Sequence, residues 1–367
     1  MIEHVLVVVF LLSTAAAVTW ALWLRAHPRE VVLPAPPPQI IYGTAPAPVP
    51  VQPPLPERLP VQPPTPPLPP PVPPPPPPVV RPVEEPPPDG TDHLRDPQAL
   101  PDGSDSVPDS LVDGVRLGRL SVRAAAVRGV TSRRDGGLRR QVAALSIVDT
   151  FQPAVLLSVV AAGDPGARIA QIGAAQAARS IRSKLTERAR DIDEAWRRRL
   201  VGDDTAAQHL THELRSALAD LGEPLAEAAR RRDLPPAAAA TQLTCVLTRL
   251  GDAERRQHLA FGVGNGIVLV ADGARAWRQA LGAVGGVLPD GQAAMTAETF
   301  ETGAGELVVL CSGTTATLLE REAAWLGEEW ASAPGMARFL YQLGVRDEVC
   351  RDDRAAVCLW EDGPHGA

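Results

Sequence analysis

Proline dominates residues 34 to about 88, and this stretch limits most strongly what the chain can fold into. The chain has 367 residues with 40 prolines, and residues 69–78 read PPPVPPPPPP. Proline fixes the backbone angle φ and has no N–H to donate, so this stretch can join neither a helix nor a sheet. We expect an extended polyproline II conformation of about 3.1 Å per residue, which means that a folded domain must lie elsewhere.

The proline-rich stretch has two possible uses. Its PxxP repeats are of the kind that polyproline-binding domains recognise, whereas a spacer would need no partner. An acidic, turn-rich stretch follows it, PPPDGTDHLRDPQALPDGSDSVPDS. Such a composition cannot bury a core. We therefore predict a disordered proline-rich and acidic linker over residues 31–111 and favour the spacer.

An uncharged apolar run precedes the linker. Val5–Leu24 has 20 residues, which matches the roughly 30 Å thickness of the hydrocarbon core of a bilayer. Trp20 and Trp23 suit the interfacial belt at its end. A cleaved signal peptide is the alternative, but no Lys or Arg precedes the run. We predict a single transmembrane anchor within residues 1–30.

Arg25 and Arg29 follow the apolar run directly. Because cytoplasmic flanks carry the excess of basic residues, we expect the N-terminus outside and the rest of the chain in the cytoplasm, at the cell membrane.

The composition becomes globular from residue 112, and we predict one domain over residues 112–362 with a short tail at 363–367. A net charge of −7 argues against nucleic acid as a partner. The sequence predicts strands at 120–129, 142–149, 154–161, 240–249, 258–273, 305–313 and 352–360, and helices at 169–185, from 205 onward and within 318–342. Asn265-Gly266 is a hairpin signal inside one of these strand regions. This order predicts an α+β fold with helices layered on mostly antiparallel sheets.

Small residues follow the apolar run 154–160, and helical spacing begins soon after. Such junctions commonly carry catalytic groups, but the position best placed to do so is Ala162.

Several short motifs follow one another with defined spacing. They read GVTSRRDGGLRRQVA at 129–143, VVAAGDPGARIAQIGA at 159–174, AATQLTCVLTRL at 239–250, GVGNG at 262–266, LCSGT at 310–314 and DDRAAV at 352–357. In order and spacing they resemble the metal-dependent protein Ser/Thr phosphatases of type 2C in their bacterial form. The resemblance covers about residues 115–361 and implies a four-layer α-β-β-α sandwich.

The resemblance also implies a chemistry, in which carboxylates hold two divalent cations that activate a water for attack on a phosphoserine or phosphothreonine. The sequence departs from the family motifs at the positions of the metal ligands. Val142, Ala162 and Ser312 fall on aspartates of the family motifs, so that only Asp352 remains, with Asp353 beside it. Mg²⁺ and Mn²⁺ require oxygen ligands, preferably anionic, and one carboxylate does not hold a pair of such ions.

Three further residues are weaker candidates. Asp164 lies two residues after Ala162 and could serve as a ligand if its loop shifts register. Arg139 and Arg140 lie near the position of the family's phosphate-binding arginine, two or three residues out of step, and could contact a phosphate or simply be solvated.

The sequence leaves three hypotheses. The first is a pseudophosphatase without a cofactor that binds a protein partner, possibly a phosphorylated one, in signalling. The second is a weak or atypical Mn²⁺- or Mg²⁺-dependent phosphatase that uses Asp164, Asp352 and Asp353. The third is an unrelated α+β scaffold.

Overall fold

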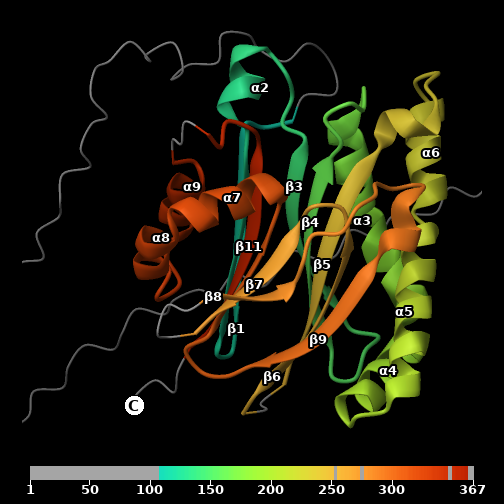
Figure 1. The fold of residues 1–367 in the computed structure, drawn as a ribbon, viewed down its shortest axis with the longest axis vertical. Helices are drawn as coiled ribbons and strands as arrows, with labels where there is room; N and C mark the ends of the chain where they lie inside the picture. The colour runs from blue at the N-terminus through green and yellow to red at the C-terminus, as the bar shows by residue number, and fades with distance from the viewer. Residues whose placement is uncertain (1–106, 252–253, 273–276, 346–348, 363–367) are drawn as a thin grey trace, which may run out of the picture. The chain divides into compact units, whose positions relative to one another are not determined.

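The computed structural model describes residues 107–251, 254–272, 277–345 and 349–362 (Figure 1). The predicted anchor Val5–Leu24, the linker up to residue 106 and the tail 363–367 lie outside the described residues. Within the described ranges, no helix has the length and apolar character to cross a bilayer.

Two antiparallel sheets form the centre of the domain. The first sheet consists, in spatial order, of β1 (Ser110–Leu117), β2 (Leu120–Val127), β11 (Arg354–Glu361), β10 (Leu307–Cys311), β7 (Ile267–Ala271) and β8 (Trp277–Leu281). The second consists of β3 (Gln141–Val148), β4 (Val155–Gly163), β5 (Thr241–Arg249), β6 (Arg256–Val263) and β9 (Thr296–Thr302).

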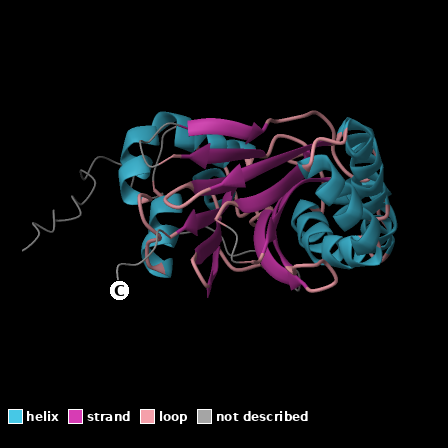
Figure 2. Ribbon diagram, turned by 90° about the horizontal axis from the view of Figure 1, so that it is seen from below, coloured by secondary structure: helices cyan, strands magenta, loops and turns pink. Residues whose placement is uncertain are grey.

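Helices cover the outer face of each sheet, as Figures 1 and 2 show. The second sheet is covered by α3 (Ala170–Glu187), α4 (Ala189–Leu200), α5 (Asp204–Ala219) and α6 (Gly222–Arg230), and the first by α7 (Gly313–Arg321), α8 (Ala323–Glu329) and α9 (Met336–Leu343). The short helix α2 (Val130–Arg134) connects β2 to β3, and single 3₁₀ turns occupy Pro236–Ala239 and Gly291–Ala294.

Alternate residues of β4 explain how the layers are held together. Leu157 and Val159 pack under α3, whereas Leu156 and Val160 pack against the other sheet. Successive side chains of a strand point to opposite faces, so a strand between two apolar layers must be apolar throughout. A third core, with Trp330 and Phe339, lies between the first sheet and its helices. The predicted α+β fold with antiparallel sheets is confirmed.

The predicted hairpin at Asn265-Gly266 is wrong. Strand β6 pairs with β5 and β9, whereas β7 pairs with β10 and β8, so the turn carries the chain from one sheet to the other. A Cβ atom on Gly266 would lie 2.2 Å from the Thr244 hydroxyl, and Gly264 has a φ of +108°. The two glycines therefore allow the chain to cross from one sheet to the other in a tight turn. A turn motif in the sequence indicates a reversal but not the partner of the next strand.

Helix α3 lies unusually close to its neighbours at two glycines. A Cβ atom on Gly173 would lie 2.1 Å from the carbonyl oxygen of Ala239, and one on Gly163 would lie 2.3 Å from that of Ala170. Only glycine permits such backbone contacts. These contacts fix the start of α3 beside the end of β4, where the predicted catalytic junction lies.

We predict that Gly173→Ala lowers the free energy of unfolding by about 1–3 kcal/mol, because the new methyl group must push the Ala239 backbone away. Denaturant unfolding followed by circular dichroism measures this change. Gly285→Ala is the matched control, since no atom lies within 4 Å of the methyl group that it would add. Equal stability of the two variants would contradict the close packing of α3.

Candidate functional site

A cavity of about 60 Å³ lies where both sheets meet the ends of β3, β4 and β5 and the start of α7. We call it the cleft. Each of the six motifs singled out in the sequence contributes at least one residue to its lining. The lining residues are Arg140, Gln141, Ala162, Gly163, Pro165, Gln242, Asn265, Gly313, Thr314, Asp352 and Asp353. The structure therefore brings together Ala162, Arg140, Asp352 and Asp353, four of the residues predicted from the sequence.

Val142 does not line the cleft. It pairs with Ala161, and both side chains belong to the core under α3. Gln141 pairs with Ala162, and this pair faces the cleft because neighbouring residues of a strand point to opposite faces. The residue of β3 that faces the cleft is therefore Gln141 and not Val142.

Ser312 does not line the cleft either. Its side chain is 1 % exposed, its hydroxyl lies 3.0 Å from that of Thr315, and it accepts the Ala355 N–H at 3.4 Å. Ser312 thus ties the start of α7 to β11. Gly313 is the next residue, and it faces the cleft.

The Asp353 carboxylate is buried, and each of its oxygens accepts one backbone hydrogen bond. One oxygen accepts the N–H of Gly129 at 2.8 Å, the other accepts the N–H of Arg140 at 2.6 Å, and the Arg140 guanidinium lies 3.8 Å away. Its backbone carbonyl accepts a hydrogen bond of 2.7 Å from the Gln141 amide. Asp353 therefore holds the segment 129–141 against the start of β11.

The two remaining acidic candidates are placed differently. Asp352 is exposed at the margin of the cleft. Asp164 lies outside the lining of the cleft and accepts the N–H of Gly166 at 2.9 Å, so that it closes its own turn.

The donor set of the cleft does not fit two divalent cations. Such a pair needs several anionic oxygens with free lone pairs. The cleft offers two carboxylates, and the oxygens of Asp353 already accept backbone hydrogen bonds. In the part of the chain that the structure describes, no group of three or more His, Cys, Asp or Glu side chains could hold a metal ion.

Neutral amides take up much of the space instead. The Asn265 N–H donates to the Gln242 side-chain oxygen at 3.1 Å. A Cβ atom on Gly313 would lie 2.7 Å from the Asn265 side-chain amide carbon. The Asn265 side chain therefore occupies the volume into which any side chain at position 313 would extend.

The two candidate arginines have different roles. Arg139 is buried, and its guanidinium donates to the carbonyl oxygens of Pro108 and Gln141. Burial lowers the pKa of Arg139, while the charges of Asp353 and Asp109 oppose that shift. Arg140 is half-buried and lines both the cleft and an adjoining open cavity of about 470 Å³. Arg140 is thus the arginine that a ligand of the cleft can meet.

We predict that Asp353→Ala lowers the free energy of unfolding by at least about 2 kcal/mol, because it leaves the Gly129 and Arg140 N–H groups without their acceptor. Asp352→Ala is the matched control and should change stability by less than about 0.5 kcal/mol, since its side chain is exposed. Denaturant unfolding with Mn²⁺ and with a chelator measures both variants. A loss that appears only with Mn²⁺ would show that Asp353 acts as a metal ligand.

The comparisons with known proteins agree with this fold. The family model "Protein phosphatase 2C" matches residues 129–326, and the chain belongs to that family. The resemblance predicted from the motifs is therefore confirmed, and the hypothesis of an unrelated scaffold is wrong. Asp352 and Asp353 lie beyond the matched residues.

Solved structures of bacterial phosphatases are similar to this chain at low identity. One described as a bacterial serine phosphatase is 12% identical, with 67% of this chain and 99% of the other covered and a TM-score of 0.46. PppA, a regulatory component of the T6SS in Pseudomonas aeruginosa, is 15% identical, with 68% and 99% covered and a TM-score of 0.42. Serine/threonine phosphatase Stp1 from Staphylococcus aureus is 11% identical, with 72% and 98% covered and a TM-score of 0.42. No curated protein matches the chain.

Proposed function

We propose that this protein is a pseudophosphatase, a phosphatase 2C domain that binds a phosphorylated protein partner without hydrolysing it. One observation carries the proposal. The family chemistry requires anionic metal ligands at the cleft. The residues that β3, β4 and the start of α7 contribute to its lining are Gln141, Ala162 and Gly313. None of them can supply a carboxylate, and a domain that lacks these ligands works without a metal cofactor.

The groups that remain favour an anionic ligand. Arg140 can make charge-assisted hydrogen bonds to a phosphate, which are among the strongest that proteins form. Helix α7 begins at Gly313 on the edge of the cleft, and no side chain caps its first N–H groups. Helix N-termini favour negative charge. Both features support binding of a phosphoserine or phosphothreonine side chain.

The sequence supports a proposal for where this binding module is located. We propose that Val5–Leu24 anchors it in the cell membrane and that the proline-rich linker holds it away from the cytoplasmic surface. A partner in signalling would then be collected at the membrane.

The alternative is a weak Mn²⁺- or Mg²⁺-dependent phosphatase that uses Asp164, Asp352 and Asp353. The geometry disfavours it, because Asp164 lies outside the cleft and Asp353 is held by two backbone N–H groups.

We predict that the full-length chain hydrolyses neither a phosphoserine peptide nor p-nitrophenyl phosphate above background in excess Mn²⁺, but binds the phosphopeptide. Arg140→Ala should weaken that binding about tenfold, because it removes the charge-assisted contact. Arg134→Ala is the matched control, since Arg134 is an exposed arginine paired with Asp135 outside the cleft. Robust turnover that a chelator abolishes would overturn the proposal.

A second prediction concerns the lost ligands. The triple variant Gln141→Asp, Ala162→Asp and Asn265→Asp places three carboxylates at the cleft without adding a side chain at Gly313, and it should gain calorimetrically measurable binding of Mn²⁺. Ala162→Asp alone is the control and should bind no Mn²⁺, because one added carboxylate is not enough. A triple variant that is folded by circular dichroism and still fails to bind Mn²⁺ would contradict the assigned positions.

A further inference from the structure

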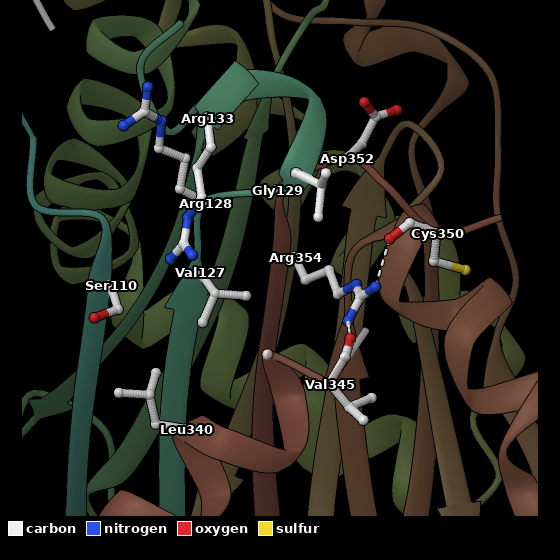
Figure 3. Close-up of a pocket in the computed structure, with 12 residues that line it drawn as sticks. Ser110, Val127, Arg128, Gly129, Arg133, Leu340, Val345, Cys350, Asp352 and Arg354 are labelled. Carbon is white, nitrogen blue, oxygen red and sulfur yellow. Dashed lines mark hydrogen bonds between the residues drawn. The ribbon is translucent and has the colours of Figure 1, made fainter. Parts of the chain in front are cut away.

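A second cavity of about 250 Å³ shares only Asp352 with the cleft (Figure 3). It lies among the start of β1, the end of β2, α2 and the end of α9. Its walls combine two kinds of side chain. Val127, Val130, Leu340 and Val345 provide apolar surface, and Arg128 and Arg133 provide positive charge.

The two arginines already hold a carboxylate and have donors to spare. Asp109 lies 2.9 Å from the Arg128 guanidinium and 3.3 Å from that of Arg133. The Arg128 side chain is 1 % exposed, and its Nε atom is buried without a hydrogen-bond partner. The Arg133 Nε atom lies 3.3 Å from the Asp109 carboxylate, and it too is buried without a hydrogen-bond partner among the described residues. A buried guanidinium with unused donors favours further anionic groups.

Exposed apolar side chains continue this surface beyond the cavity. Tyr341 is 58% exposed and follows Leu340, and Val349 is 61% exposed and precedes Cys350, which also lines the cavity. An apolar surface beside two arginines that share one carboxylate suits a peptide that carries both aliphatic and acidic residues.

The sequence next to the cavity has this chemistry. Residues 94–106 read LRDPQALPDGSDS, with Asp96, Asp102 and Asp105 against a single arginine, and with Leu94 and Leu100 as aliphatic residues. They directly precede Val107, and the chain reaches the cavity at Ser110. Six residues lie between Leu100 and Val107, and the seven residue steps from one to the other can span up to about 23 Å.

We propose that residues 94–106, which lie outside the described residues, bind in this cavity. Leu100 packs against Leu340 and Val345. Asp102 and Asp105 contact Arg133, as Asp109 already does. A segment tethered so close has an effective concentration of about a millimolar or more, so it occupies the surface ahead of most free ligands. A partner with the same chemistry must displace it. This inference concerns a different surface from the cleft and does not depend on the proposed function.

Photo-crosslinking in the full-length chain tests the proposal. Benzoylphenylalanine replaces Leu100, and the crosslinked peptides are identified by mass spectrometry. We expect crosslinks within one molecule to residues 336–345. The matched control carries the crosslinker at Leu68, in the proline-rich stretch, and should yield at least about fivefold less of this product.

A charge swap separates specific docking from mere proximity. Arg133→Glu, on a partly exposed side chain, should lower the crosslink yield at least about fivefold, and adding Asp102→Arg and Asp105→Arg should restore it. The proposal is overturned if Arg133→Glu has no effect or if Leu68 gives the same product. It is equally overturned if crosslinks reach only a second copy of the chain, only another protein, or another part of the domain.

Discussion

The Asp353 carboxylate is the contact on which the arrangement of the cleft depends. It joins the start of β11 in the first sheet to Gly129 and Arg140, which flank the connection from the first sheet to the second. The motifs on both sides of the cleft are thus held together by backbone N–H groups. A buried carboxylate needs such partners because desolvation makes an unpaired charge very costly. Here backbone N–H groups of the protein supply them, so these hydrogen bonds can hold this edge of the domain together in place of metal ions.

The cost of uncompensated buried charge also explains why neutral side chains surround the cleft. Several carboxylates packed together repel one another unless cations compensate them. With Gln141, Ala162 and Gly313 in place, that repulsion is absent, and the Asn265 side chain fills the space. A cleft of this composition still presents Arg140 and a helix N-terminus to a ligand. Under the function proposed above, these two features would serve binding of a phosphorylated partner without hydrolysis.

Much of the fold could be predicted from the sequence, since apolar runs such as β4 and the periodicity of α3 are set by burial. Four of the residues singled out from the sequence line the cleft, Arg140, Ala162, Asp352 and Asp353, whereas Val142 and Ser312 do not. A shift of one position turns a strand side chain to the opposite face, which is why Val142 was favoured over Gln141. Neither the use of Asn265-Gly266 as a crossing between sheets nor the choice between Arg139 and Arg140 could be predicted, because both depend on contacts between segments distant in the chain. Strands β1, β8 and β9 lack a strong apolar pattern and were missed.

The burial of Arg139 has a mechanical consequence. Its guanidinium bonds on one side to the Pro108 carbonyl, where the chain enters the domain, and on the other to the carbonyl of Gln141 in the lining of the cleft. The Arg139 side chain therefore links Pro108 to the cleft over a path much shorter than the 32 residues of backbone between Pro108 and Gln141. The next residue, Asp109, is held to Arg128 by a backbone hydrogen bond and an ion pair, so the Arg139 guanidinium and these contacts would share tension applied at Pro108.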